Sequence, residues 1–508
     1  MRLHEILDGI EFASTRGPAE VEIAAVRYDS RAVNPGDLFV AIRGEQADGD
    51  DYVASALTRG ALAIVSEQPA PAPFNRTWVQ VPSARRTLAV AAANFYRHPA
   101  RGLKLIGVTG TNGKTTTTYL LESILRTAGH PTGLIGTVEY RSQVGQKGCM
   151  EPAHHTTPES LDLQARLAEW RDGGVSWGAM EVSSHGLALD RVYALPFAAA
   201  VFTNLARDHL DFHGDFQNYF EAKQRLFLGH GAPPPPVVAL NSDDPYGQRL
   251  RARCRGRVML LYGSGEGAQV TAREISAAAS GLSFILSTPV GSAKVRSPLV
   301  GWPNLSNILA AAAATLALDF PLDTVVAGIE ALTHVPGRFE RIEAGQPFTV
   351  VVDFAHTDLA FETLLQTARE LTRGRVLIVF GCGGDRDRTK RPVMGEIAAR
   401  HADTVILTTD NPRSEDPVRI LNDILVGVQK AGANYEVVTD RAQAFARAFE
   451  LARAGDLVLL AGKGHQREQI FRDHVEPWNE RESARAVLRR MGFSQRVSQF
   501  RPAALRGH

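Results

Sequence analysis

One segment constrains the fold more than any other: an apolar run leads into a glycine-rich loop that is followed by hydroxyl residues. Residues 103–108 read Leu-Lys-Leu-Ile-Gly-Val, and residues 109–116 read Thr-Gly-Thr-Asn-Gly-Lys-Thr-Thr. The apolar run predicts a buried strand, and a helix is expected to begin near Lys114. A strand, loop and helix in this order indicate an α/β protein whose ligand lies at the carboxyl ends of the strands.

The loop contains the residue types that bind phosphate. Gly110 and Gly113 let backbone N–H groups converge on phosphate oxygens, and the helix N-terminus adds partial positive charge. Lys114 can reach the β- and γ-phosphates, while the Thr115 hydroxyl can ligate Mg²⁺. The strict GxxxxGK[ST] pattern has glycine where this chain has Val108. A turn that only starts a helix is the alternative, but strand, lysine and paired threonines together favour a nucleotide site.

The rest of the chain alternates short β-branched runs with longer amphipathic stretches, which predicts an α/β fold. A length of 508 residues suggests about three domains. We expect boundaries at 1–99, 100–335 and 336–508, with the last domain a doubly wound sheet. Residues 270–295 predict a β-hairpin, and residues 304–318 a helix. The expected strands are residues 38–41, 63–65, 78–81, 103–108, 178–182, 200–203, 237–240, 349–352, 376–380, 405–408 and 457–460.

Composition excludes several function classes. Hydrophobic residues make up 44% and charged residues 22%, which is typical of a soluble globular protein. A net charge of +1 argues against a nucleic-acid or membrane surface. Three cysteines without a CxxC pair argue against disulfides and thiolate metal sites. No signal peptide is apparent, and the longest apolar run, residues 308–318, is too short for a membrane span. We therefore expect a cytoplasmic protein.

Three further segments place polar residues where strands are expected to end. Glu181-Val-Ser-Ser-His and Asp208-His-Leu-Asp each follow an apolar strand, and Lys223 lies on a predicted helix. A carboxylate and an imidazole at strand ends near a phosphate loop can complete a cation site. Taken singly, Glu181 fits a capping acid, His209 a buried structural histidine and Lys223 a solvated lysine.

Together these motifs resemble the Mur ligase family, and the resemblance covers essentially the whole chain. It implies an N-terminal uridine-binding α/β domain, a central P-loop ATPase-like domain and a C-terminal Rossmann-like doubly wound domain. The catalytic residues that it implies are Lys114, Glu181, His209 and Lys223. The implied metal ligands for Mg²⁺ are Thr115, Glu181, His209 and a carbamylated Lys223. The implied ATP contacts are Gly110, Thr111, Asn112, Gly113, Lys114, Thr115, Thr116, Asn304, Asn307 and Arg338.

The outer segments indicate the other substrates through the same resemblance. Contacts to a UDP-linked muramoyl-peptide are implied for Ser30, Gln46, Thr156, Thr157, Ser183 and Arg191. The segment Asp410-Asn411-Pro412-Arg413 resembles the motif of members that add meso-diaminopimelate. Its arginine suits a substrate with a distal carboxylate, because a guanidinium fork binds a carboxylate bidentately. Diaminopimelate contacts are implied for Arg386, Asp410, Asn411, Pro412, Arg413, Gly462 and Gln466. The family's Gly-Lys-Gly-His-Glu ends in Gln466 here, so a neutral amide replaces an anion.

The resemblance implies an enzyme that uses ATP to join diaminopimelate to UDP-N-acetylmuramoyl-L-alanyl-D-glutamate through an acyl phosphate. This reaction belongs to cytoplasmic peptidoglycan precursor synthesis, and we expect a monomer. Three alternatives are a sister ligase that adds L-lysine, folylpolyglutamate synthase chemistry on the same core, and a non-catalytic nucleotide-binding scaffold. Arg413 argues against lysine, the uridine-type N-terminal segment argues against folate, and retention of all four catalytic residues argues against a scaffold.

Overall fold

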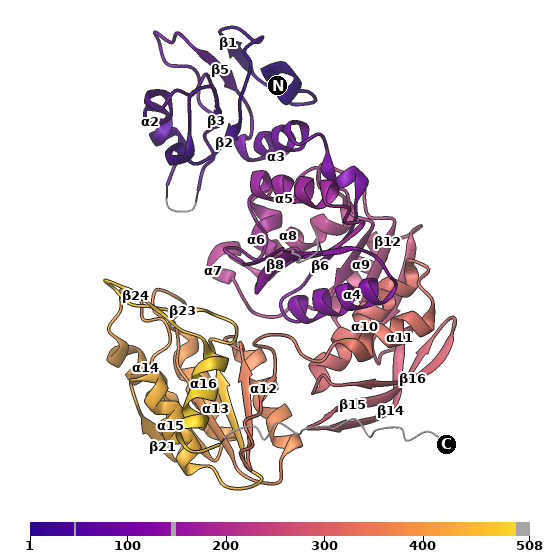
Figure 1. The fold of residues 1–508 in the computed structure, drawn as a ribbon, viewed down its shortest axis with the longest axis vertical. Helices are drawn as coiled ribbons and strands as arrows, with labels where there is room; N and C mark the ends of the chain where they lie inside the picture. The colour runs from indigo at the N-terminus through magenta and orange to yellow at the C-terminus, as the bar shows by residue number, and fades with distance from the viewer. Residues whose placement is uncertain (45–46, 144–148, 494–508) are drawn as a thin grey trace, which may run out of the picture. The chain divides into compact units, whose positions relative to one another are not determined.

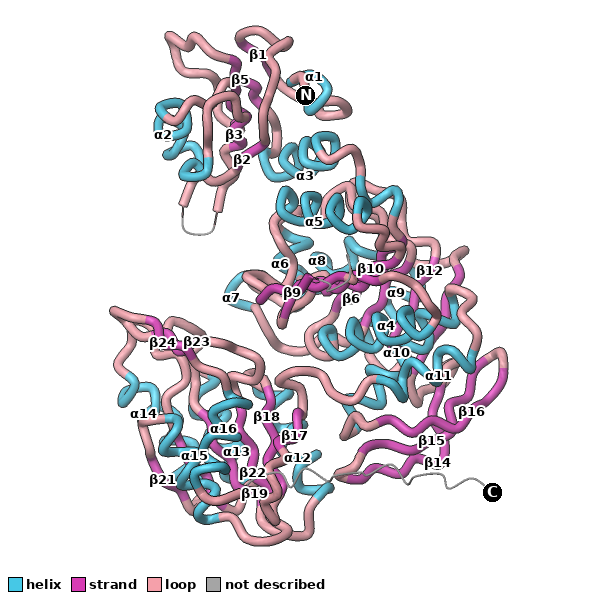
Figure 2. The backbone as a smooth tube through the Cα atoms, viewed as in Figure 1, coloured by secondary structure: helices cyan, strands magenta, loops and turns pink. Residues whose placement is uncertain are grey.

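The computed structural model describes residues 1–44, 47–143 and 149–493. The backbone forms two compact units. The first contains Met1–Ser276, Ser283–Ser297 and Pro303–Leu332, and the second contains Ala277–Leu282, Pro298–Trp302 and Thr333–His508. Among the described residues, no helix is long and apolar enough to cross a membrane. Helices and strands alternate along the chain, as Figures 1 and 2 show, so the predicted α/β class is confirmed.

The N-terminal part of the first unit is a five-stranded sheet in the order β1-β5-β4-β3-β2. Its elements are α1 (Leu3–Ile6), β1 (Ser14–Arg16), β2 (Val26–Arg27), β3 (Leu38–Val40), α2 (Val53–Thr58), β4 (Ala63–Ser66), β5 (Thr77–Gln80) and α3 (Ala84–Phe95). Strands β2 to β5 are parallel and β1 is antiparallel. Side chains alternate between two cores, with Leu38 and Val40 in one and Phe39 in the other.

An eight-stranded sheet in the order β13-β12-β11-β6-β10-β7-β8-β9 follows. Its strands are β6 (Lys104–Thr109), β7 (Thr132–Ile135), β8 (Glu139–Ser142), β9 (Cys149–Pro152), β10 (Trp177–Glu181), β11 (Ala199–Phe202), β12 (Val237–Asn241) and β13 (Val258–Tyr262). Strand β6 pairs in parallel with β10 and β11, and the register aligns Glu181 with Val108 and Phe202 with Thr109. The carboxyl ends of these three strands therefore meet at one edge.

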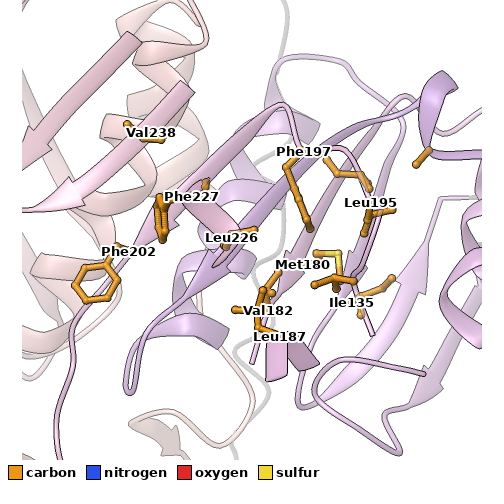
Figure 3. Close-up of a cluster of buried hydrophobic side chains, with 14 of the residues drawn as sticks. Ile135, Met180, Val182, Leu187, Leu195, Phe197, Phe202, Leu226, Phe227 and Val238 are labelled. Atoms are coloured by element: carbon orange, nitrogen blue, oxygen red, sulfur yellow. The ribbon is translucent and has the colours of Figure 1, made fainter. Parts of the chain in front are cut away.

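Helices cover both faces of this sheet. They are α4 (Lys114–Thr127), α5 (Ser160–Asp172), α6 (Ser184–Ala188), α7 (Leu210–His213), α8 (Phe216–Leu228), α9 (Pro245–Arg253), α10 (Trp302–Ala317) and α11 (Leu322–Ala331). Figure 1 shows α5, α6 and α8 on one face, and α4, α10 and α11 on the other. In the core beneath α8, Leu226 and Phe227 pack toward strand side chains such as Met180 and Phe202 (Figure 3).

The predicted hairpin at residues 270–295 is wrong, because three strands are present. They are β14 (Thr271–Ala278), β15 (Gly281–Thr288) and β16 (Gly291–Ser297), and they form one sheet in that order. Strand β15 alternates buried Leu282, Phe284 and Leu286 with partly exposed neighbours, as an amphipathic strand should. Strand β16 carries a single large apolar residue, the buried Val295, so its periodicity in the sequence is too weak to detect.

The second unit contains a six-stranded sheet in the order β17-β18-β22-β19-β20-β21. Its strands are β17 (Glu340–Ile342), β18 (Thr349–Asp353), β19 (Val376–Phe380), β20 (Thr404–Leu407), β21 (Tyr435–Val437) and β22 (Leu457–Ala461), with a separate hairpin of β23 (Glu468–Ile470) and β24 (Val475–Pro477). Its helices are α12 (Asp358–Leu371), α13 (Lys390–His401), α14 (Pro417–Ala431), α15 (Arg441–Leu451) and α16 (Glu480–Arg490). Only β17 is antiparallel within the sheet.

Alternate residues of the second unit's strands enter two different cores. Ile378 and Phe380 pack with α12, α13 and α14, whereas Leu377 and Val379 pack with α15 and α16. Both faces of a parallel sheet are therefore covered, and the predicted doubly wound fold is confirmed. Each predicted strand in the chain is present within one residue at either end. Runs buried on both faces are continuous in sequence, and for that reason they were predictable.

Candidate active site

The phosphate loop lies at the carboxyl end of β6, between the ends of β10 and β11. Gly110 and Gly113 have φ values of 150° and 85°, a region that favours glycine. A Cβ atom on Gly110 would stand 1.8 Å from Thr203 Oγ1, and one on Gly113 would stand 2.2 Å from Asn307 Oδ1. The loop is therefore packed so closely against β11 and α10 that both positions require glycine. Helix α4 begins at Lys114, as predicted.

Two lysines converge on one backbone carbonyl in this loop. Lys114 Nζ donates to Gly110 O at 2.9 Å and to Thr111 O at 2.8 Å. Lys223, which α8 supplies, donates from Nζ to the same Gly110 O at 2.8 Å. The Lys223 side chain is fully buried, and this burial, with the charge of Lys114, lowers its pKa well below the usual value. The positive charge of the Lys223 ammonium group is therefore disfavoured at this position.

Tyr219 joins these groups, although it was not among the predicted site residues. Its hydroxyl lies 3.1 Å from Thr111 Oγ1, and Lys223 Nζ lies 4.4 Å from the centre of its ring. Tyr219 and Lys223 are one helical turn apart on α8 and share a face. That spacing is the sequence signal by which Tyr219 could have been found.

His209 stands at the start of α7 with a left-handed backbone (φ 52°). Its Nε2 atom lies 3.3 Å from Asp208 Oδ2, and its ring is 4.6 Å from the ring of His185. Desolvation lowers the pKa of His209 to about 4, which favours a neutral imidazole near pH 7 although 43% of the side chain is exposed. A neutral imidazole has a lone pair available to a metal ion.

Glu181 is fully buried at the end of β10 and accepts two hydrogen bonds from Thr137. The Thr137 amide donates to Oε1 at 2.7 Å, and its hydroxyl donates to Oε2 at 2.9 Å. The same hydroxyl lies 3.1 Å from the Thr156 hydroxyl. Sequence reasoning missed Thr137, because only the pairing of β7 with β10 brings it to Glu181.

Some of the predicted metal ligands are donors that suit Mg²⁺, and the Lys223 amine is not. In the described portion of the chain, no three histidine, cysteine, aspartate or glutamate side chains converge to hold a metal ion. The Glu181 carboxylate and the buried Thr115 hydroxyl are hard oxygen donors of the kind that Mg²⁺ prefers. Lys223 as an amine adds no oxygen, whereas its carbamate would add two.

Four of the six predicted muramoyl-peptide residues cluster beside Glu181. Thr157 Oγ1 lies 2.9 Å from the Glu181 carbonyl oxygen and 3.1 Å from Ser183 Oγ. Arg191 donates from Nη1 to Thr157 O at 3.0 Å and from Nε to Glu159 Oε1 at 2.8 Å. Thr156 belongs to this cluster because its hydroxyl lies beside the Thr137 hydroxyl that donates to Glu181. Two residues lie elsewhere: Ser30 is buried at the start of a short 3₁₀ helix, Ser30–Ala32, and Gln46 lies outside the described residues.

The three predicted ATP contacts outside the phosphate loop are Asn304 and Asn307 in the first unit and Arg338 in the second. Asn304 and Asn307 are buried on α10, where Asn307 Nδ2 donates to Asn304 Oδ1 at 3.3 Å. Asn307 also lies against Gly113 of the phosphate loop. Arg338 belongs to the second unit, in which its guanidinium stands 4.7 Å from the centre of the Phe354 ring.

In the second unit, two predicted arginines converge around Gly383. A Cβ atom on Gly383 would stand 2.9 Å from Arg413 Nη1 and 3.8 Å from Arg386 Cγ. Arg413 has a left-handed backbone (φ 51°), and its Nη1 donates to Gly384 O at 2.7 Å. Burial and the charge of Arg386 lower the pKa of Arg413. Two arginine side chains that both approach Gly383 bring two positive charges to these loops, which suits an anion such as a carboxylate.

A buried lysine connects the remaining predicted residues of that site. Lys463 is fully buried and lies 3.3 Å from Asp410 Oδ1, 2.8 Å from Asn411 Oδ1 and 3.4 Å from Gln466 Oε1. Asn411 Nδ2 also donates to Gln466 Oε1, at 3.0 Å. Two donors therefore fix the orientation of the Gln466 amide. Lys463 was not predicted as a site residue, although it lies within the Gly462 motif.

Gly462 and Pro412 shape the two loops around this lysine. Gly462 has a φ of 105°, and a Cβ atom there would stand 3.2 Å from Asp410 Oδ2. Pro412 O accepts from Glu415 N at 3.0 Å and closes the turn that presents Arg413. The predicted amino-acid residues thus gather at the carboxyl ends of β19, β20 and β22.

Comparison with known proteins identifies the family. Residues 108–315 match the Mur ligase middle domain, residues 22–96 the Mur ligase family catalytic domain, and residues 337–464 the Mur ligase glutamate ligase domain. A protein of Solibacter usitatus named UDP-N-acetylmuramoyl-L-alanyl-D-glutamate–2,6-diaminopimelate ligase is 48% identical, over 97% of this chain and 100% of its own. The chain belongs to the Mur ligase family.

Solved structures of other Mur ligases share the fold. A UDP-N-acetylmuramoyl-L-alanyl-D-glutamate–2,6-diaminopimelate ligase is 30% identical with a TM-score of 0.68, covering 97% of this chain and 100% of its own. The MurF ligase of Thermotoga maritima, solved in complex with ADP, is 20% identical with a TM-score of 0.59 and covers 93% and 97%. The predicted family, fold and ligase class are confirmed, whereas the roles of individual site residues and the domain boundaries stay predictions.

Proposed function

We propose that this Mur ligase joins meso-diaminopimelate to UDP-N-acetylmuramoyl-L-alanyl-D-glutamate with ATP, as a cytoplasmic monomer in peptidoglycan precursor synthesis. The convergence of Arg386 and Arg413 around Gly383 carries the choice of amino acid, because it provides a cationic site for the distal carboxylate. The Solibacter usitatus relative, which matches 97% of this chain, has the name of this activity.

The phosphate loop would bind and activate ATP. Backbone amides of residues 110–113 and the N-terminus of α4 would hold its phosphates, and Lys114 would leave the loop carbonyls for the β- and γ-phosphates. Asn304 and Asn307 would lie on the base side, since Asn307 contacts the loop, and Arg338 would contact ATP. The γ-carboxylate of D-glutamate attacks the γ-phosphorus, the bond to ADP breaks, and an acyl phosphate forms.

Magnesium, when bound, neutralises negative charge on the transferring phosphoryl group. Thr115, Glu181, His209 and a carbamylated Lys223 would hold it. Burial lowers the pKa of Lys223, which favours the neutral amine that adds to carbon dioxide; loss of a proton then leaves a carbamate. The modification turns a buried amine into an oxygen ligand beside the loop, which supplies the donor that the unmodified side chain lacks.

The muramoyl-peptide and diaminopimelate would each be held by one of the clusters of predicted residues described above. Thr156, Thr157, Ser183 and Arg191 would contact the muramoyl-peptide near Glu181, and Ser30 and Gln46 would contact the uridine end. Arg386 and Arg413 would bind the distal carboxylate of diaminopimelate, within a pocket formed with Asp410, Asn411, Pro412, Gly462 and Gln466. The free amine then attacks the acyl carbon, and phosphate leaves through a tetrahedral intermediate.

Product analysis tests the proposal. The protein is incubated with ATP, Mg²⁺, the UDP-linked dipeptide and diaminopimelate, and the products are separated and weighed by mass spectrometry. We expect one UDP-linked tripeptide for each ADP, and no tripeptide when any one substrate is omitted. ADP formed without tripeptide in the complete mixture would reject the ligase reaction proposed for this chain.

A further inference from the structure

Arg391 on α13 is a fully buried arginine that touches both arginine-bearing loops. Its Nη1 and Nη2 donate to Glu415 Oε2 and Oε1 at 2.9 and 2.8 Å, which is a bidentate pair. Nη2 also reaches Gly383 O at 3.3 Å, and Nη1 reaches Asp423 Oδ2 at 2.9 Å. Gly383 belongs to the loop after β19, and Glu415 belongs to the loop after β20. One guanidinium therefore bridges the loop of Arg386 and the loop of Arg413.

A second set of bonds joins the same loops at the neighbouring residues. The Asp385 amide donates to Glu415 Oε1 at 2.7 Å. Ser414 donates from its amide to Asp385 Oδ2 at 3.1 Å and from its hydroxyl to Asp385 Oδ1 at 2.6 Å. Asp385 directly precedes Arg386, and Ser414 directly follows Arg413. The bonds thus hold the backbone immediately beside both guanidinium-bearing residues.

The backbone at these positions is strained. Asp385 has a φ of 53° and Arg413 a φ of 51°, in the left-handed region that non-glycine residues seldom occupy. Arginine has no special tolerance for this region, so the surrounding bonds must hold it there. Glu415 can do so over a wide pH range, because its hydrogen bonds from Arg391 lower its pKa to about 2.

We propose that Arg391, Glu415 and Asp385 form a clamp that fixes the spacing of Arg386 and Arg413 and so sets the affinity for the amino-acid substrate. These three are positioning residues, because they act through the two arginines that face the ligand. The inference rests on the proposed function, in which Arg386 and Arg413 bind the distal carboxylate. A site with two guanidiniums loses affinity when they are free to move apart, because binding then costs the conformational entropy lost in ordering them.

The variant Glu415→Gln tests the clamp with little change in shape. Glu436→Gln is its matched control, because Glu436 forms a bidentate pair with Arg447 in the same unit, at 2.7 and 2.8 Å. We expect Glu415→Gln to raise the KM for diaminopimelate about tenfold or more, while the KM for ATP and for the UDP-linked dipeptide changes less than twofold. The control should leave all three constants unchanged. Unchanged diaminopimelate KM in a folded Glu415→Gln protein overturns the proposal.

Two further measurements keep the test decisive. Asp385 is exposed, so Asp385→Ala should fold even if Glu415→Gln does not, and it should raise the same KM, with Asp385→Asn raising it less. Hydrogen exchange on the full chain should be faster at the amides of Asp385 and Ser414 in Glu415→Gln than in the unaltered protein. Unchanged exchange there would mean that no clamp exists, whatever the substrate. Failure of the proposed function shows itself differently, as absence of diaminopimelate turnover in the unaltered protein with the exchange difference intact.

Discussion

The phosphate loop and the arginine-bearing loops both present cations at the carboxyl ends of parallel strands, but they hold them differently. In the first, Lys114 and Lys223 donate to the backbone carbonyl of Gly110. In the second, Lys463 pairs with Asp410, and Arg391 pairs with Glu415. We call the phosphate loop the nucleotide region and the arginine-bearing loops the amino-acid region, after the roles proposed above. The first depends on backbone geometry, and the second depends on charged side chains. Apart from loss of Lys223, substitutions that change shape should damage the first region most, and substitutions that change charge should damage the second.

The largest expected effect on activity is that of replacing Lys223, the one side chain on which the region of the phosphate loop also depends. Lys223→Ala removes the only predicted metal ligand that requires carbamylation. We expect kcat to fall about a thousandfold, the upper end of what loss of one charge-stabilising group costs. Formate or chloride should restore part of the activity by occupying the vacated space, with phosphate release as the readout. Full activity in Lys223→Ala would contradict the carbamate proposal.

A steric change in the loop should rank next. Gly110→Ala would place a Cβ atom 1.8 Å from Thr203 Oγ1, so the loop must move. A displacement of about 1 Å in such a site can cost about a hundredfold in rate, and we expect that loss in kcat/KM for ATP. Gly129→Ala is the matched control, since Gly129 also has a positive φ but nothing within 4 Å of its Cβ position. Equal losses in both variants would mean that backbone strain, rather than the loop's packing, is responsible.

A charge change should be selective for the amino-acid region. Arg413→Ala removes one half of the arginine pair, and a charged hydrogen bond contributes about 1.5–3 kcal/mol. We expect the KM for diaminopimelate to rise roughly 10- to 100-fold while the KM for ATP stays the same. Arg419→Ala, an exposed arginine on α14, is the control. A similar rise in both KM values for Arg413→Ala would show that the arginine does not select the amino acid.

The smallest expected effect concerns Gln466, which sharpens the comparison. Its Oε1 atom accepts from Asn411 and Lys463, and a glutamate would keep both bonds and add a negative charge. That charge would attract the distal ammonium of diaminopimelate, and a partly exposed ion pair contributes about 1 kcal/mol at most. We expect Gln466→Glu to lower the KM for diaminopimelate about threefold. A higher KM would place the distal ammonium away from this residue.

Much of the fold could be predicted, because it depends on local patterns. Strands that are buried on both faces, such as β19 and β22, are continuous apolar runs. The strand, the glycines and the lysine of the phosphate loop all lie within residues 103–116. Strand β16 was missed because Val295 alone gives it an apolar period. Local sequence therefore identified the strands wherever burial left a periodic record.

The contacts within the site could not be predicted in the same way. Thr137 reaches Glu181 from 44 residues away, and Lys463 reaches Asp410 from 53 residues away. Arg391 was passed over because its partner Glu415 lies on the next parallel strand's loop, 24 residues along the chain. Such pairs depend on the order of strands in the sheet, which no local period encodes. The family resemblance implied the residues that we propose to contact ligands, and the structure shows which side chains are bonded to them.

The most direct test of the central claim is amino-acid-dependent phosphate release by the unaltered protein. The protein is given ATP, Mg²⁺ and the UDP-linked dipeptide, with either meso-diaminopimelate or L-lysine at equal concentration. The arginine pair should bind the distal carboxylate, which lysine lacks, so we predict release with diaminopimelate at least about tenfold faster than with lysine. Equal or faster release with lysine would contradict the account.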